Sequence, residues 1–147
     1  MARNKQGFTL IELLVVIAII GLLSTLSIVA LNNARARSRD ARRVSDVKQM
    51  QTALELYYND VGNYPPSASV TAGGTIANGS TVYMQIVPTA PTPNDGSCTA
   101  GTNTYTYTQR TVTTTGDSYT ISYCVGQTIT NGPTGGSLTS ATPAGIK

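Results

Sequence analysis

The clearest pattern in the chain is an unbroken apolar stretch near its N-terminus. No charged side chain occurs from Leu13 to Leu31, and a helix of that length spans roughly 28 Å, close to the hydrocarbon thickness of a bilayer. The stretch therefore predicts a helix that can cross a membrane. A conventional secretory signal has a shorter apolar core of about 7–15 residues, whereas this one is longer and is entered through Glu12.

Beyond this stretch the pattern becomes that of an amphipathic helix. Apolar side chains recur at three- and four-residue steps, at Val44, Val47, Met50, Leu54, Tyr57 and Val61. No proline precedes Pro65, and Gly62 followed by Asn63-Tyr64-Pro65 is a helix stop signal. We expect one helix from about Thr9 to Asp60, whose second half packs its apolar stripe on another element.

The C-terminal half predicts a β-hairpin. Residues 105–109 and 119–125 alternate strictly between apolar and polar positions, and Thr114–Asp117 between them is a turn signal. The side chains expected to cover the helix stripe are Tyr105, Tyr107, Tyr119, Ile121, Tyr123 and Val125. We expect an irregular connection over 67–97 with one short helix or strand at Val82–Val87, and a loop with at most an edge strand over 128–147. The fold class is α+β, a long helix on a small antiparallel sheet.

Composition removes most enzymatic functions. The chain has 147 residues and no histidine, so Ser-His-Asp and Cys-His catalysis and His-ligated metals are excluded. No general base, nucleophile partner or metal cluster stands out among the remaining residues. We therefore expect no enzyme, no catalytic residue and no metal site.

The formal net charge of +3 comes from two short segments rather than a basic surface. Arg3 and Lys5 form a basic tip, and a run of arginines extends from Arg35 to Arg43. We interpret the run first as a solvated helix face that touches lipid headgroups, and second as a contact to acidic groups of neighbouring copies. DNA capture by Arg35–Arg43 is the least favoured interpretation, because no aromatic side chains interleave to stack on bases.

The segment Gly7-Phe8-Thr9-Leu10-Ile11-Glu12, fused to the apolar helix, resembles the N-terminus of the type IV pilin superfamily, which includes the pseudopilins of type II secretion. Members have a short basic leader that ends in glycine, then a phenylalanine, and a glutamate as fifth residue after the cut. The stretch from Ala41 to Pro65 is also similar to the second half of the long helix in major pseudopilins and related pilins. The resemblance implies a leader over 1–7, a transmembrane and polymerisation helix over 8–31, its amphipathic continuation over 32–62, and a β-rich head over 63–147.

The resemblance implies that other proteins act on this chain. A prepilin peptidase would cut between Gly7 and Phe8 and methylate the new amino group of Phe8. The precursor would be a single-pass membrane protein with a cytoplasmic N-terminus, stored in lipid. An assembly platform and its ATPase would build it into a homopolymer, an extracellular or cell-surface filament. The charge rule for membrane orientation conflicts with this, since more arginines follow the apolar stretch than precede it.

Two alternative functions stay open. A major pseudopilin of a type II secretion-like system would share the same N-terminus and act as a piston rather than a surface fibre. A secreted binding protein would instead be released by a conventional signal peptidase after Ala36, where Ala34-Arg35-Ala36 forms an A-x-A pattern.

Glu12 needs its own explanation, since a carboxylate beside lipid is costly. Its head group could lie in water at the membrane face. The resemblance implies that in a filament it neutralises the Phe8 ammonium of a neighbouring subunit and fixes the axial register.

Cys98 and Cys124 are the two cysteines of the chain. In an exported domain of this size such a pair is most simply a disulfide, the alternative being two unpaired thiols. The resemblance implies that the bridge staples a C-terminal loop to the sheet. We expect no cofactor: major pseudopilins often bind calcium in such a loop, but Asp95 and Asp117 are too few carboxylates for more than a weak site.

Overall fold

The computed structural model describes residues 7–111, 117–129, 132–135 and 138–146. The chain divides into two compact units, Met1–Arg35 and Ala36–Lys147. One helix, α1 (Leu10–Val61), runs through both, and its bounds lie within one residue of those predicted. The helix ends where the stop signal places it, because Gly62 adopts a left-handed conformation at φ 81° and its N–H binds the Tyr58 carbonyl at 2.8 Å.

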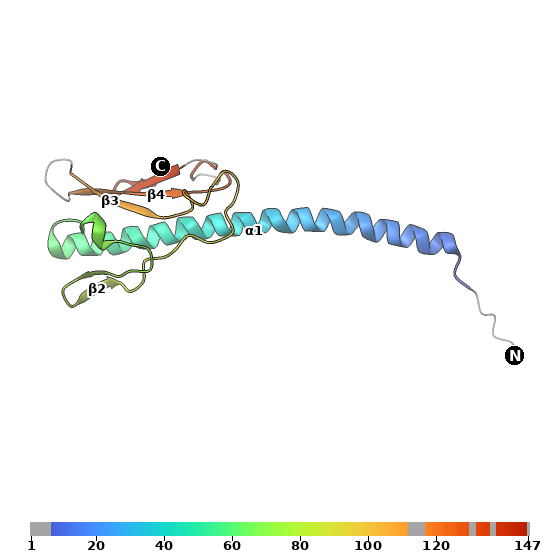
Figure 1. Ribbon diagram of the computed structural model, residues 1–147, viewed down its shortest axis with the longest axis horizontal. Coiled ribbons are helices and arrows are strands. Elements are labelled where there is room, and N and C mark those ends of the chain that lie inside the picture. Colours follow the sequence, from blue (N-terminus) through green and yellow to red (C-terminus); the bar gives the residue numbers. More distant parts are fainter. Residues whose placement is uncertain (1–6, 112–116, 130–131, 136–137, 147) are drawn as a thin grey trace. The chain divides into compact units, whose positions relative to one another are not determined.

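The second unit is the C-terminal half of α1 packed on two small antiparallel sheets. The larger sheet has the order β3-β4-β5-β6. Its strands are β3 (Thr106–Arg110), β4 (Ser118–Cys124), β5 (Leu138–Thr142) and β6 (Gly145–Ile146). A separate hairpin joins β1 (Ile76–Asn78) and β2 (Thr81–Met84), after a 3₁₀ turn at Ser67–Ser69. Figure 1 shows the larger sheet along one side of this part of α1 and the hairpin along another.

The core lies between the helix stripe and the inner face of the larger sheet. Val47, Met50, Leu54 and Tyr57 are buried, and Val44 and Val61 pack at the margin. The six side chains predicted to cover the stripe are all buried in the same cluster. The predicted hairpin is confirmed as the antiparallel pair β3–β4, with Thr108 opposite Thr120. Its predicted turn, Thr114–Asp117, falls mostly on residues 112–116, which lie outside the described ranges.

The prediction for residues 128–147 was wrong, since this segment contributes two strands rather than a loop with an edge strand. β5 lies inside the sheet, paired with β4 on one side and β6 on the other. Its residues Leu-Thr-Ser-Ala-Thr alternate between faces, with Thr139 and Ala141 buried. Such small side chains give a weak hydrophobic pattern, and the pairing is supplied by the neighbouring strand instead.

Candidate functional site

The helix begins with a reciprocal hydrogen-bonded cap formed by Thr9 and Glu12. The Glu12 carboxylate accepts the Thr9 N–H at 2.8 Å and the Thr9 hydroxyl at 2.7 Å, while the Thr9 hydroxyl oxygen accepts the Glu12 N–H at 3.3 Å. This is a capping box, which satisfies donors that the first turn of a helix leaves free. Gly7 and Phe8 therefore precede the helix in non-helical chain. The leader residues Met1–Gln6 lie outside the described part of the chain.

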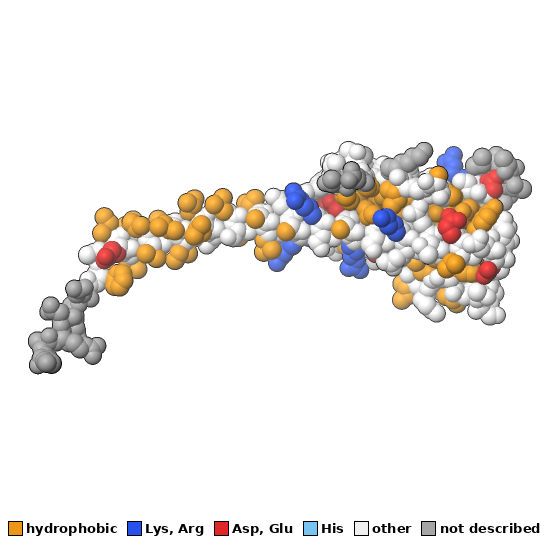
Figure 2. Space-filling model, turned by 180° about the vertical axis from the view of Figure 1, so that it is seen from behind, with side chains coloured by type: hydrophobic (Ala, Val, Ile, Leu, Met, Phe, Trp, Pro, Cys, Tyr) orange, Lys and Arg blue, Asp and Glu red, His pale blue; other side chains and the backbone are white. Residues whose placement is uncertain are grey.

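The first half of α1 is covered with exposed apolar side chains. The large hydrophobic residues from Phe8 to Leu31 are between 48% and 87% exposed, and Figure 2 shows hydrophobic side chains along this half of the helix. Among the described residues, α1 alone is long and apolar enough to cross a membrane, by length and composition. So large a bare apolar surface marks a site of contact with lipid or with other protein.

The hydroxyl groups inside the apolar stretch bond to their own helix. Ser24 donates to the Ile20 carbonyl at 2.7 Å, and Ser27 donates to the Leu23 carbonyl at 2.9 Å. Such backbone bonds leave no free hydroxyl donor for lipid or a neighbouring helix to satisfy. The apolar stretch is therefore suited to a dry environment despite these residues.

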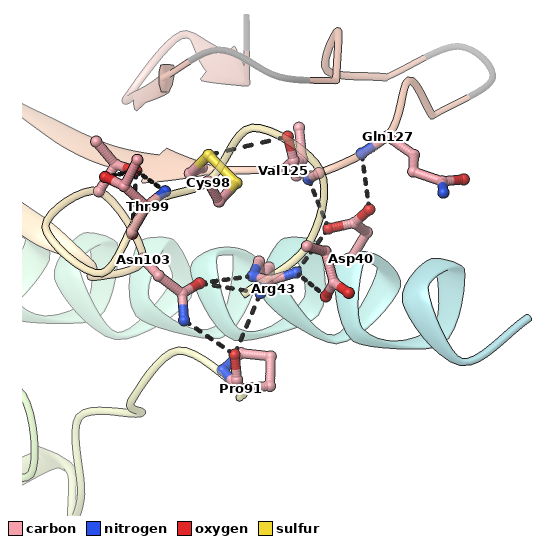
Figure 3. Close-up of a disulfide and its surroundings, with 12 residues drawn as sticks. Asp40, Arg43, Pro91, Cys98, Thr99, Asn103, Val125 and Gln127 are labelled. Atoms are coloured by element: carbon pink, nitrogen blue, oxygen red, sulfur yellow. Dashed lines mark hydrogen bonds and ion pairs between the residues drawn. A yellow bond between two sulfur atoms is a disulfide. The ribbon is translucent and has the colours of Figure 1, made fainter. Parts of the chain in front are cut away.

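The second unit contains a buried ion network that the sequence analysis did not foresee. Arg43 is fully buried, and its guanidinium donates to Asp40 at 2.7 Å, to Asp95 at 3.1 Å and to Asn103 at 2.9 Å. Arg39 makes a two-pronged pair with the same Asp95 carboxylate. These bonds hold the long loop between β2 and β3 against α1 (Figure 3).

Asp40 extends the network to the segment after β4. Its carboxylate accepts the backbone N–H groups of Gly126 and Gln127, each at 2.9 Å. A buried charge is tolerated only when it is paired and hydrogen-bonded, and Asp40 and Arg43 meet that condition. One stretch of the helix thus anchors two distant segments of the head.

The predicted disulfide is present. Cys98 and Cys124 are bonded, with their Cα atoms 5.9 Å apart. Cys98 lies in the loop that carries Asp95, and Cys124 ends β4. The disulfide therefore joins the loop between β2 and β3 to the sheet. The ion network joins the same loop to α1 (Figure 3).

One expectation about charged residues needs correction. The arginine run is not uniformly solvated, because Arg39 and Arg43 turn inward to Asp95 while Arg37 and Arg42 stay exposed. Asp95, considered as a calcium ligand, is buried and paired with the two guanidinium groups. The Arg39 guanidinium, with Arg43 beside it, holds the pKa of the Asp95 carboxyl below its ordinary value. The network spans more than fifty residues of chain, so no local pattern signals it.

The capping box, by contrast, was visible in the sequence and was overlooked. Thr9-Leu10-Ile11-Glu12 has the S/T-x-x-E spacing of that motif directly before an apolar run. It fixes where the helix begins, and therefore leaves the Gly7–Phe8 peptide bond outside it. Gly7, Phe8 and Glu12 are thus neighbours at one helix end, whereas the two cysteines lie in the other unit.

Comparison with known proteins agrees with these features. Residues 2–28 match the family described as the prokaryotic N-terminal methylation motif. The chain is 38% identical over 89 residues to the type IV major fimbrial protein FimA of Dichelobacter nodosus, covering 55% of this chain and 57% of that protein. It is 34% identical over 92 residues to the fimbrial protein EcpC of Eikenella corrodens, covering 63% and 60%.

A type II secretion protein is also similar. The core protein G of Escherichia coli K12 is 40% identical over 65 residues, covering 44% of this chain and 45% of that protein. The chain thus aligns with less than two thirds of the length of each of these relatives. No solved structure is significantly similar. With its N-terminal methylation motif, exposed apolar helix and small antiparallel head, the chain resembles the superfamily of type IV pilins and type II secretion pseudopilins.

Proposed function

We propose that this protein is a structural subunit of a type IV pilus or pilus-like filament. The observation that carries the proposal is the bare apolar half of α1, which follows directly on the capped Gly7-Phe8-Thr9 segment. Burying such a surface among copies is favourable by about 25 cal/mol per Å² relative to water. Because the same side chains are already out of water in a membrane, extraction offsets much of this gain, and an assembly platform with an ATPase supplies the difference.

Processing would occur at the Gly7–Phe8 bond. Phe8 is 87% exposed and both residues precede the capped helix, so a prepilin peptidase at the membrane face can reach the bond. The cut removes only the basic leader and leaves the apolar helix in the product. Methylation of the Phe8 amino group would follow, before the subunit moves from lipid to a surface filament.

Glu12 would exchange partners on assembly. In the single chain its carboxylate is held by Thr9, one residue from the amino group that cleavage creates at Phe8. In the filament we propose that Glu12 accepts the Phe8 ammonium of a neighbouring subunit. Both charges then lie paired in a dry core, which fixes the axial register.

Mass spectrometry of the first peptide of the isolated protein tests the proposal. We expect a peptide that begins at Phe8 and carries one methyl group on its amine. A Gly7→Val variant is the matched control and should keep its leader, because a branched side chain beside the scissile bond hinders the peptidase. A product that begins at Arg37 would contradict the proposal and favour a secreted binding protein released after Ala36.

The second candidate is a pseudopilin, favoured by the similarity to the type II secretion core protein G. Both functions predict the same first peptide, so a different measurement separates them. Deletion of the gene in its own host, followed by electron microscopy of the cell surface and assay of secreted proteins, should remove fibres if the protein is a pilin. Loss of secretion with surface fibres unchanged would identify a pseudopilin instead.

A further inference from the structure

The basic and acidic residues of α1 are segregated in the order that the helix dipole disfavours. The helix carries all its Lys and Arg residues between Arg35 and Lys48, while the stretch from Gln49 to Val61 contains Glu55 and Asp60 and no cation. A helix C-terminus carries partial negative charge and ordinarily attracts Lys or Arg. Here the last turn holds Asp60 and no basic residue.

Asp60 has little compensation inside its own chain. It is exposed, and its carboxylate accepts one hydrogen bond, from the Tyr83 hydroxyl at 3.0 Å. No cation pairs with it among the residues that the structure describes. Glu55 differs, because the Tyr64 and Tyr119 hydroxyls occupy its carboxylate. Asp60 thus presents a negative charge to the surroundings at the negative end of the helix.

A groove at the other end of the head presents the opposite charge. It has a volume of about 370 Å³ and is lined by Arg37, Asp40, Ala41, Gln127, Thr128 and Ile129. The Asp40 carboxylate is already paired with Arg43 and accepts hydrogen bonds from two backbone N–H groups. Arg37 is exposed and has no ion pair within the described ranges. The groove therefore offers an unpaired cation.

The two charges cannot meet within one chain. Arg37 and Asp60 are 23 residues apart in α1, which places them about 35 Å apart along the axis and about 140° apart around it. They lie on nearly opposite sides of the helix. When two parallel copies lie side by side with an axial offset, such positions face each other. Contacts of this kind use two different patches and build open filaments.

Arg42 is not suited to this contact. It lies 18 residues before Asp60, which is five whole turns, so both point to the same side of α1. Its guanidinium also lies 3.9 Å from the Asp46 carboxylate of its own chain.

We infer that the groove at Arg37 receives the Asp60 end of α1 from a second copy of this chain, offset by about 35 Å along the helix and therefore a different neighbour from the one that pairs Glu12 with Phe8. This contact rests on the proposed function, and it names the surface through which the heads associate once the apolar helices are buried. We assign the groove to a second copy of this chain because Asp60, at the end of its α1, supplies the anion that Arg37 in the groove lacks. The axial offset brings the two residues to the same height.

A charge swap tests the contact in filaments formed by the full chain. Arg37→Glu and Asp60→Lys each place like charges together, which opposes association across an interface. We expect each single variant to yield at least roughly tenfold fewer filaments, and the double variant Arg37→Glu/Asp60→Lys to recover most of them. Arg110→Glu is the matched control, since it makes the same charge change at an exposed position on β3 and should leave filament yield unaffected.

The readouts separate the contact from folding and from the proposed function. Protease resistance of the head and retention of its disulfide report that each variant folds. Filaments from all variants at the wild-type yield would overturn the contact and leave the proposed function standing, as would a double variant that stays defective. A loss of membrane-stored precursor with Arg37→Glu alone would overturn it in favour of lipid headgroups. If the wild-type chain forms no filament, the proposed function itself fails.

Discussion

The hydroxyl of Tyr123 is buried in the core and has no hydrogen-bond partner among the described residues. Its phenol ring is fully buried, and burial raises the pKa of Tyr123 to about 12. An unpaired buried hydroxyl is destabilising, so we expect Tyr123→Phe to keep the free energy of unfolding or raise it by about 1 kcal/mol. Denaturant unfolding of the detergent-solubilised chain measures this change.

Tyr105→Phe is the matched control for that prediction. The Tyr105 hydroxyl donates to the Asp46 carboxylate at 2.9 Å, and Asp46 is itself buried. Removing the donor takes this hydrogen bond from the buried Asp46 carboxylate, which should lower the free energy of unfolding by about 1–3 kcal/mol. An equal loss of unfolding free energy in Tyr123→Phe and Tyr105→Phe would contradict the destabilising role assigned to the Tyr123 hydroxyl.

The Asp95 carboxylate makes the head sensitive to acid. Its pKa is lowered in the folded state, chiefly by Arg39 and then by Arg43, so the unfolded chain binds the proton more readily. The stabilisation is therefore complete above the ordinary carboxyl pKa near 4 and is lost as pH falls through the lowered value. We expect the free energy of unfolding to fall steeply below about pH 4.

Asp95→Asn tests whether Asp95 causes this loss of stability in acid. The variant should be less stable at neutral pH by about 1.5–3 kcal/mol, because Arg43 loses one of its two carboxylate partners and keeps Asp40. Its remaining acid dependence should be shallower than that of the wild type. Asp60→Asn, at an exposed carboxyl, should leave the slope nearly unchanged, and an unaltered slope in Asp95→Asn would disprove the assignment.

At the scale of elements, the loop between β2 and β3 is held by a close backbone approach as well as by ion pairs. Gly96 has φ 54°, and a Cβ atom there would lie 2.2 Å from the Gly126 carbonyl oxygen. Gly79 has a similar φ of 57° but open space around it. We expect Gly79→Ala to cost about 1–2 kcal/mol for the left-handed backbone, and Gly96→Ala to cost clearly more. Comparable unfolding midpoints for the two variants would show that the close approach is not tight.

The disulfide should stabilise the same loop from its other side. Closing the 26-residue separation between Cys98 and Cys124 is worth about 3–4 kcal/mol in the chain-entropy account. A Cys98→Ala/Cys124→Ala variant should lose that amount in denaturant unfolding. Because Asp95 lies on the bridged loop, limited proteolysis should cut that loop first in this variant, while cleavage elsewhere would contradict the assignment.

Elements with strong local periodicity could be predicted from the sequence, and elements that depend on distant partners could not. The helix shows its apolar run and its stripe, and the tyrosines of β3 and β4 alternate strictly, so both were foreseeable. β5 has small polar residues and owes its place to pairing with β4. The contact of Arg43 with Asp95 joins residues 52 positions apart, so no spacing rule points to it.

At the scale of the whole molecule, the two halves of α1 have different roles. A leucine from each half allows the two roles to be tested separately. Leu23 is 57% exposed in the apolar half, whereas Leu54 is fully buried against the sheet. Leu54→Ala should lower the free energy of unfolding of the head by about 2–5 kcal/mol, since it opens a cavity in a small core. Leu23→Ala should leave head stability unchanged, because its side chain belongs to the bare surface.

Filament assembly should depend on Leu23 rather than on Leu54. A polar change at the exposed position, Leu23→Asn, removes apolar area and adds an amide that a dry helix bundle cannot easily satisfy. We expect it to reduce filament yield while the head keeps wild-type protease resistance. Leu54→Ala should still give filaments at temperatures where its weakened head stays folded. If Leu23→Asn assembled normally, the apolar half of α1 would not be the polymerisation surface, whatever the stability of the head.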